Sequence, residues 1–221
     1  MSEYEFRAEI LRFGKMLHDR GLIAATDGNI SVRLNQNSVL VTPTCICKGM
    51  MDTEDLLVVD MQGGRVSGFR DVTSEIGMHL TIYRMRPDIN AIVHAHPPTA
   101  TGFAACGLAL DQALISEVLL ALGPVPLAHY ATPGTSELSE ALEPYIPNHD
   151  AVLMANHGVV TYGSDLMTAY MHMETVEHFA KIALVVKQLG CERPLKDEQV
   201  NKLHEMRQRI QSYKSEMRTR A

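Results

Sequence analysis

The sequence has few cysteines and no long apolar segment. Four cysteines in 221 residues are too sparse for the disulfide framework of a small secreted domain. No run of about 18 apolar residues occurs, so we expect no membrane-spanning helix. The first residues carry charges every few positions and no apolar stretch, so we also expect no signal peptide. These absences predict a soluble protein of the reduced cytoplasm.

An excess of positive charge is also missing. The formal net charge is -6, and no block of basic residues stands out. A nucleic-acid-binding protein normally presents a basic face, so we expect no nucleic-acid partner. The most basic stretch, residues 206–220, also contains Glu216 and is typical of a solvated helix face.

Apolar spacing predicts helices and strands that alternate along the chain. Helices are expected at residues 5–20, 73–86, 99–106, 116–122, 136–142, 164–189 and 196–219. Strands are expected at residues 30–34, 39–42, 56–61, 89–96, 125–130 and 151–156. Thr73 or Ser74 and then Ser164 are expected to cap helices. Because no linker or internal repeat divides the chain, we predict one α/β domain over residues 1–221, with a central sheet flanked by helices.

The segment Ile92-Val93-His94-Ala95-His96 is the most informative part of the sequence. In a strand, side chains two residues apart point to the same face, so His94 and His96 would aim together. Two imidazoles on one face can share a divalent cation at about 2 Å. The two prolines that follow end the strand, which places the pair at a strand end, where α/β sheets bind ligands.

A third histidine and a carboxylate are available to complete a metal site. His157 follows the expected strand at residues 151–156, and Gly158 would let the backbone turn sharply after it. Glu75 is the best candidate carboxylate, in the first turn of the helix expected after Ser74. Three histidines with one displaceable carboxylate or water are typical of an open catalytic zinc site.

Less specific interpretations apply to several of these residues. A pair of histidines two apart is, by itself, more often a surface or core pair. The remaining histidines are interpreted as surface or packing residues: His18, His79, His129, His149, His172, His178 and His204. Cys45 and Cys47 lack the second pair that a structural zinc site needs, so they are interpreted as ordinary thiols.

Five short motifs occur in an order that resembles the class II aldolase/adducin family, the group of L-fuculose-1-phosphate aldolase and L-ribulose-5-phosphate 4-epimerase. The resemblance extends from about residue 5 to residue 190. The motifs are Thr26-Asp27-Gly28-Asn29-Ile30-Ser31, Thr42-Pro43-Thr44, Thr73-Ser74-Glu75, His94-Ala95-His96-Pro97 and Asn156-His157-Gly158.

The resemblance implies a fold, an assembly and a set of site residues. The fold would be a three-layer α/β/α domain around a mainly antiparallel sheet, assembled into a homotetramer with active sites at subunit interfaces. His94, His96 and His157 would hold the metal, with Glu75 as an acid/base that can also bind it. The implied phosphate site consists of Gly28, Asn29, Thr44, Thr73 and Ser74. Such a site suits an anion, because it combines a glycine turn, amide and hydroxyl donors and the start of a helix. By itself, Asp27-Gly28-Asn29 is interpreted as a plain turn.

The sequence departs from the family pattern at two places. Cys45 stands where members usually have glycine. No tyrosine lies in residues 110–117, where the aldolases contribute one to a neighbouring subunit. Tyr130 and Tyr213 are possible substitutes, although packing roles are expected for both. Lys48 is interpreted either as a phosphate partner or as a surface lysine.

The resemblance and the residues together predict an aldolase dependent on Zn²⁺, with Mn²⁺ or Co²⁺ as alternatives. It would cleave a ketose 1-phosphate reversibly into dihydroxyacetone phosphate and an aldehyde. A sugar-phosphate 4-epimerase, a dehydratase or a decarboxylase could use the same metal cradle. A non-catalytic adducin-like interaction module is a further alternative, but it would not need the histidines and Glu75.

Overall fold

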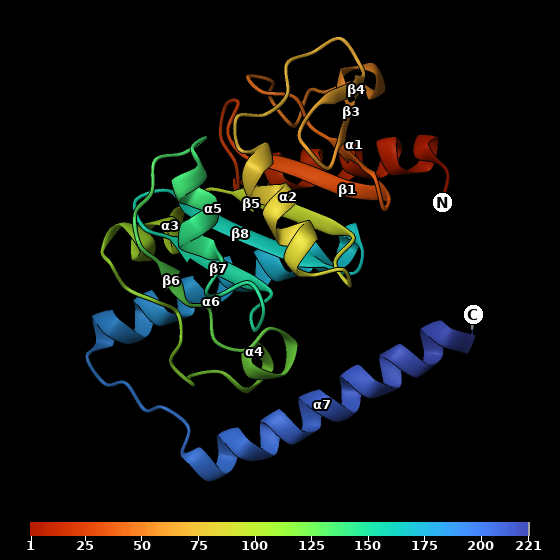
Figure 1. The fold of residues 1–221 in the computed structure, drawn as a ribbon. Helices are drawn as coiled ribbons and strands as arrows, with labels where there is room; N and C mark the ends of the chain where they lie inside the picture. Colours follow the sequence, from red (N-terminus) through yellow and green to blue (C-terminus); the bar gives the residue numbers. More distant parts are fainter. Residues whose placement is uncertain (221) are drawn as a thin grey trace.

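The computed structural model describes residues 1–220, and their strands form one twisted sheet (Figure 1). The strand order is β4-β3-β2-β1-β5-β8-β7-β6. Every neighbouring pair is antiparallel except β6 and β7, which confirms the expected mainly antiparallel sheet. The strands are β1 (Asn29–Asn35), β2 (Ser38–Val41), β3 (Leu57–Asp60), β4 (Arg65–Ser67), β5 (Ala91–Ala95), β6 (Leu127–Ala128), β7 (Ala151–Met154) and β8 (Gly158–Gly163).

Helices cover both faces of the sheet and produce the predicted three layers. The helices are α1 (Glu3–Asp19), η1 (Thr53–Asp55), α2 (Ile76–Met85), α3 (Pro98–Ala105), α4 (Ser116–Ala121), α5 (Ser136–Leu142), α6 (Leu166–Leu189) and α7 (Asp197–Arg220). Apolar residues of α1, α3, α4 and α6 pack on one face, and those of α2 and α5 pack on the other. Helix α7 lies beside α4 and then extends away from the sheet (Figure 1).

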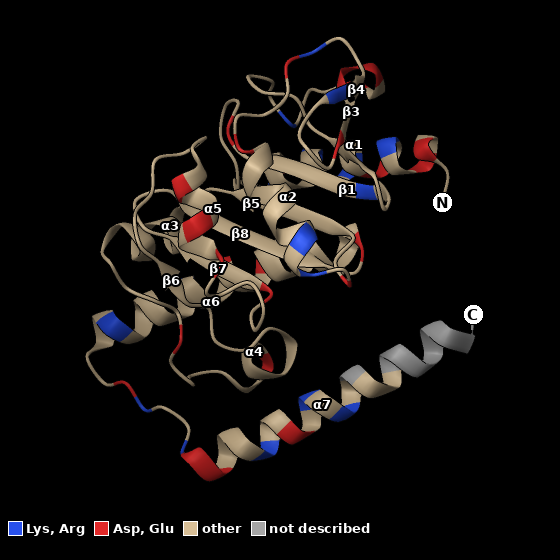
Figure 2. Ribbon diagram, viewed as in Figure 1, with Lys and Arg blue, Asp and Glu red and all other residues tan. Residues whose placement is uncertain are grey.

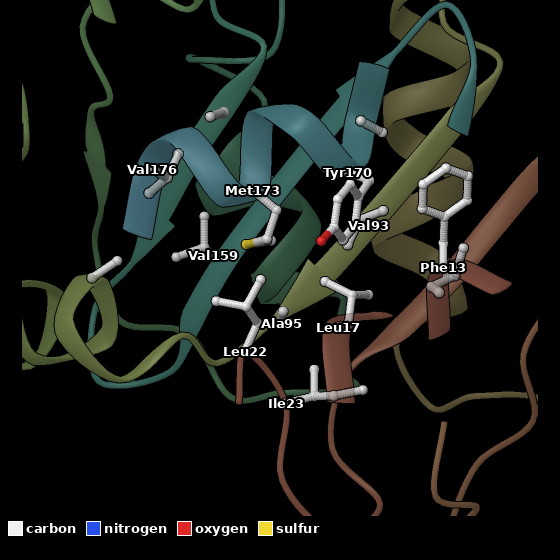
Figure 3. Close-up of a cluster of buried hydrophobic side chains, with 14 of the residues drawn as sticks. Phe13, Leu17, Leu22, Ile23, Val93, Ala95, Val159, Tyr170, Met173 and Val176 are labelled. Atoms are coloured by element: carbon white, nitrogen blue, oxygen red, sulfur yellow. The ribbon is translucent and has the colours of Figure 1, made fainter. Parts of the chain in front are cut away.

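The alternation of side chains along β5 separates the core from the site. Val93 and Ala95 join the cluster under α1 and α6, where Phe13 and Tyr170 lie with ring centroids 5.0 Å apart (Figure 3). The intervening His94 therefore points to the opposite face, which α2 covers. Val93 and Ala95 thus stabilise the packing under α1 and α6, while His94 faces the site on the same side of the strand as the buried Ile92.

Two features of the described helices are their apolar length and their charge. Among residues 1–220, no helix is both long and apolar enough to cross a membrane. Figure 2 shows Lys and Arg interspersed with Asp and Glu along the described part of α7. Lys202 and Glu198, one helical turn apart there, form an ion pair of 2.7 Å.

Four details differ from the sequence-based expectations. Neither Thr73 nor Ser74 caps α2, because the helix starts at Ile76 and Glu75 occupies the N-cap position. The cap of α6 is Asp165 rather than Ser164. The sequence also did not predict β4 or β8, and β8 is buried along its whole length.

Candidate metal centre

Three histidine side chains converge at the end of β5. Ligand nitrogens of His94, His96 and His157 all lie within 4.8 Å of one another. The Nε2 atoms of His94 and His96 are 3.1 Å apart. Ligands of a tetrahedral ion with bonds of about 2 Å lie roughly 3.3 Å apart, so this spacing suits a shared cation. The structure confirms that His94 and His96 aim together and that His157 joins them.

The hairpin between β7 and β8 delivers His157 to the pair. Asn156 turns the chain with a left-handed φ of +54°, a conformation that asparagine tolerates better than most residues. Gly158 is not left-handed, so the expectation that it makes the turn is wrong. A Cβ at Gly158 would lie 2.5 Å from Cδ2 of His96 and 2.6 Å from the carbonyl oxygen of Ala95. Glycine is required here for close approach to the histidines.

Hydrogen-bond partners on the far side of two imidazoles direct their Nε2 atoms to the centre. Nδ1 of His94 donates to the carbonyl oxygen of Val159 at 2.9 Å, which turns Nε2 toward the centre. Nδ1 of His96 lies 3.4 Å from a carboxylate oxygen of Asp27. Burial, together with repulsion from His94 and His157, lowers the pKa of His96 to about 4, so its ring is neutral at pH 7. Neutral, oriented imidazoles are the form that binds metals.

The carboxylate of Glu75 lies among the same nitrogens. One oxygen is 3.1 Å from Nε2 of His157, and the other is 3.3 Å from Nε2 of His94. Burial alone would raise the pKa of Glu75, but these two rings outweigh burial and hold the pKa well below its usual range. Glu75 in turn raises the pKa of His94 against the effect of burial. The group is therefore an ionised carboxylate in a largely buried position.

The donor set fits a divalent cation. Nδ1 of His157 is buried without a hydrogen-bond partner among the residues that the structure describes, and Oε1 of Glu75 has only the ion-pair contact of 3.1 Å to Nε2 of His157. Buried polar atoms are normally satisfied, and this carboxylate oxygen has capacity for a further partner such as a cation. Three imidazoles and a carboxylate match the open type of site, in which one position is exchangeable.

Two of the residues expected to bind phosphate lie against Glu75. The amide nitrogen of Asn29 donates to Glu75 Oε2 at 2.8 Å and contacts the hydroxyl of Thr73 at 3.3 Å. Gly28 has a left-handed φ of +69°, and a Cβ there would lie 2.7 Å from the carbonyl oxygen of His94. The glycine therefore serves both the turn and the close approach of β1 to β5.

The other expected phosphate residues lie nearer the surface. Thr44 is half-buried and contacts the thiol of Cys45 at 3.6 Å, and Ser74 is exposed. Because α2 starts at Ile76, Thr73 and Ser74 form the turn before the helix and not its first turn. Cys45 adopts a left-handed φ of +57°, the conformation that glycine accommodates most easily.

Lys48 is not a surface lysine. It is 2% exposed, and its ammonium donates to the carbonyl oxygens of Thr26 and Ile46, both at 2.8 Å. Burial lowers its pKa to about 8. Lys48 thus joins the loop before β1 to the loop after β2. Tyr130 and Tyr213 are 57% and 64% exposed, so the packing roles expected for them are wrong.

Sequence reasoning missed two residues next to the site. Asp27 was interpreted as part of a turn, and no local pattern indicated that it would meet His96. His79 was interpreted as a surface or packing histidine, yet it is fully buried and bonds to Asn29 at 2.5 Å. A signal existed for His79, because Glu75, His79 and Tyr83 follow one another at four-residue spacing on one helix face.

The chain is similar to several known proteins. Residues 8–184 match the family described as Class II Aldolase and Adducin N-terminal domain. The chain is 35% identical to a 3-oxo-tetronate 4-phosphate decarboxylase of Pectobacterium atrosepticum, over 84% of this chain and 86% of that protein. It is 34% identical to a 5-deoxy-D-ribulose 1-phosphate aldolase of Bacillus thuringiensis, over 89% of this chain and 92% of that protein.

A solved structure extends the similarity to three dimensions. The structure of an L-fuculose 1-phosphate aldolase superposes with a TM-score of 0.87 at 34% identity, covering 93% of this chain and 97% of that chain. The matched region contains the sheet, the three converging histidines and Glu75. The chain therefore belongs to the class II aldolase and adducin N-terminal domain family.

Proposed function

We propose that this protein is a divalent-metal-dependent aldolase that reversibly cleaves a ketose 1-phosphate into dihydroxyacetone phosphate and an aldehyde. The observation that carries the proposal is the ionised carboxylate of Glu75 beside the nitrogens of His94 and His157. A metal-binding site needs only the imidazoles. An enzyme that transfers a proton also needs an acid/base group at the same place. Relatives with aldolase names, each 34% identical to this chain, support the reaction class.

His94, His96 and His157 would hold the ion, and Glu75 could add a fourth, displaceable ligand. Zn²⁺ suits this set, and Mn²⁺ or Co²⁺ are alternatives. A divalent ion held there supplies electrostatic stabilisation of the negative charge that develops on substrate oxygens when a carbon–carbon bond breaks.

Glu75 would move the proton of the reaction. In the cleavage direction the C4 hydroxyl loses its proton as C4 becomes the aldehyde, and Glu75, which starts ionised, takes up a proton and passes it to C3, the carbon that retains the electron pair of the broken C3–C4 bond. In the synthetic direction its carboxylate removes that proton from dihydroxyacetone phosphate. Such positioned acid–base catalysis contributes about 10²–10⁴-fold to rate. Its lowered pKa keeps the group ionised and ready to act as the base.

The phosphate would bind at the turns beside Glu75. Gly28 would let the backbone approach the phosphate closely. Amide and hydroxyl donors would come from Asn29, Thr44, Thr73 and Ser74. One amide hydrogen of Asn29 would stay on Glu75. The second, which makes the longer 3.3 Å contact to Thr73, would then donate to a phosphate oxygen placed beside Thr73.

A decarboxylase is the second candidate, because the relative with that name is equally similar at 35% identity. Loss of carbon dioxide from a 3-oxo acid phosphate also leaves an electron pair on a carbon next to a carbonyl group. Glu75 would protonate that carbon just as in the aldolase reaction. The two reactions thus differ in the leaving group and share the residues described above.

The proposal includes a homotetramer in the cytoplasm. Exposed apolar side chains near the end of α6 offer surface for contact between copies, namely Leu184, Val185 and Leu189. The four cysteines are free thiols, as a reduced compartment requires. Light scattering after size-exclusion chromatography gives the number of copies, and a monomeric mass would remove the tetramer from the proposal.

The experiment that tests the reaction compares two products from one enzyme preparation. Ketose 1-phosphates of the fuculose, rhamnulose, ribulose and 5-deoxyribulose types are assayed for dihydroxyacetone phosphate, and 3-oxo-tetronate 4-phosphate is assayed for carbon dioxide. Wild-type protein is used after EDTA treatment and again after restoring zinc, manganese or cobalt. The Glu75→Gln variant retains the shape of the side chain and removes its charge.

Release of dihydroxyacetone phosphate that requires both the metal and Glu75 supports the aldolase. Release of carbon dioxide without cleavage of any ketose 1-phosphate overturns it in favour of the decarboxylase. Activity that survives complete removal of metal contradicts both assignments.

A further inference from the structure

A row of buried polar side chains runs from Glu75 into the core between β1 and α2. Asn29, Ser31, His79 and Tyr83 are exposed by 4%, 0%, 0% and 1%. Burial of polar groups is costly unless they are hydrogen-bonded. The row contains a histidine and a tyrosine that the proposed proton transfer does not use.

Each member of the row contacts the next. The hydroxyl of Tyr83 lies 2.9 Å from Oγ of Ser31, which lies 2.7 Å from Nδ1 of His79. Nε2 of His79 lies 2.5 Å from Oδ1 of Asn29, whose amide nitrogen donates to Oε2 of Glu75 at 2.8 Å. The contacts form one continuous chain of hydrogen bonds that ends on Glu75.

The chain has a single direction. A carboxylate only accepts, so the NH₂ group of Asn29 faces Glu75 and its Oδ1 must accept from His79. Nε2 of His79 therefore carries the hydrogen, and Nδ1 accepts from the hydroxyl of Ser31. The oxygen of Ser31 then accepts from Tyr83. Every donor points toward Glu75, and the hydrogen-bond network defines the tautomer of the histidine.

The surroundings of His79 agree with this assignment. Burial lowers the pKa of His79 to about 3, so its ring is neutral and Nδ1 can accept a hydrogen bond. At the other end, the guanidinium of Arg33 lies 4.6 Å from the centre of the Tyr83 ring and donates to the Tyr83 carbonyl oxygen at 2.8 Å. Arg33 thus holds the start of the chain in place without joining it.

We propose that His79, Ser31 and Tyr83 are positioning residues, and that their one-directional chain locks the Asn29 amide with its NH₂ group toward Glu75. The proposal rests on the proposed function in that Glu75 is taken as the proton-transferring group. If the amide turned over, its Oδ1 would face the carboxylate of Glu75 and the two oxygens would repel. Glu75 would then leave its place between His94 and His157.

Two variants weaken the hydrogen-bond chain, and one matched variant serves as a control. Tyr83→Phe removes the first hydroxyl and keeps the ring. His79→Gln can still donate to Asn29 but cannot also accept from Ser31 in the same geometry. Tyr162→Phe is the control: it also removes a hydroxyl from a fully buried tyrosine of the same apolar cluster, and that hydroxyl has no partner in the described residues.

Zinc affinity is measured first, by competition with a chelating dye, because it needs no substrate. We expect affinity to fall about 3-fold in Tyr83→Phe and about 10–100-fold in His79→Gln, the range typical of residues behind a metal ligand. Tyr162→Phe should match the wild type. On a Glu75→Gln background the effects of both chain variants should disappear, since they act through Glu75.

Substrate kinetics supply the second measurement. The chain variants should lower kcat by similar factors while KM changes less than about 2-fold, because positioning of an acid/base affects the transition state. Zinc affinity and kcat that match Tyr162→Phe in both chain variants would overturn the positioning role. Persistence of the affinity losses on the Glu75→Gln background would also overturn it. If the wild type cleaves no sugar phosphate, the proposed function fails. Zinc affinity still tests whether the hydrogen-bond chain positions Glu75.

Discussion

Replacement of Gly158 by alanine tests the geometry of the metal centre most directly. The added Cβ would lie 2.5 Å from Cδ2 of His96 and 2.6 Å from the carbonyl oxygen of Ala95. Ordinary carbon–carbon contacts are about 3.5 Å, so one partner must retreat by about 1 Å. Ala95 pairs with Val159 in the β5–β8 ladder, which holds its carbonyl group in place. The imidazole of His96 can move away from the new Cβ, whereas the clash with the Ala95 carbonyl oxygen is relieved only by a shift of the paired backbone.

A displacement of about 1 Å exceeds the roughly 0.5 Å tolerance of a functional constellation. We expect Gly158→Ala to weaken zinc binding about 10–100-fold, as loss of a supporting group typically does. Overpacking of the core should also lower the free energy of unfolding by about 1–3 kcal/mol. Zinc affinity is measured by dye competition, and unfolding of the metal-free protein is measured in urea.

Gly102→Ala is the matched control for this variant. Gly102 lies in α3, shortly after His96, and a Cβ there would meet nothing within 4 Å. Alanine is favoured over glycine inside a helix by about 0.5–1 kcal/mol, so this variant should be as stable as the wild type or more stable. If Gly158→Ala binds zinc within 2-fold of the wild type and unfolds at the same urea concentration, the close-approach argument is wrong.

Three further outcomes are expected. Glu177 is 3% exposed and accepts N–H groups at the start of α3 at 2.9–3.2 Å, so Glu177→Ala should lower the free energy of unfolding by about 1–3 kcal/mol in urea. Lys48→Met removes the donor from two backbone carbonyls and should cost a similar amount, also measured in urea. Folding lowers the pKa of His79, so the stability of the metal-free protein should fall as pH drops below about 6.5, where the unfolded chain takes up the proton. Between pH 6.5 and 5 this loss should be roughly 1–2 kcal/mol smaller in His79→Gln than in the wild type, and equal slopes in urea titrations would contradict it.

The convergence of the histidines could be predicted because its signals are local. His94 on β5 and His96 directly after the strand point the same way through simple alternation, and two prolines follow the end of that strand. The fold class followed from the order of apolar patterns and from the resemblance. By contrast, β8 was not predicted, because it follows β7 after a turn of only three residues. Only a tight hairpin through Asn156 allows a second buried strand to start directly at Gly158.

The hydrogen bonds around the site could not be predicted, because they depend on long-range pairing. In the β1–β5 ladder Asn29 lies opposite His94, although 65 positions separate them in the chain. This register brings the Asn29 amide to Glu75 and buries His79 beneath it. A one-residue slip would turn Asn29 to the other face of the sheet, and no local pattern excludes that slip. The four-residue spacing of the polar face of α2 was the one available sign.

The parts of the site differ in how firmly they are held, and this difference suggests a division of roles. His94 lies on β5, and His157 lies in the hairpin that joins β7 to β8, the strand paired with β5, so backbone pairing leaves both imidazoles little freedom. Glu75 instead projects from the N-terminal end of α2, and its amide donor is Asn29. A rigid set of imidazoles suits a constant metal position. A carboxylate held by one side-chain amide and two imidazole contacts, and not by backbone pairing, has more freedom to move, as the proposed proton transfer to and from a substrate carbon would require.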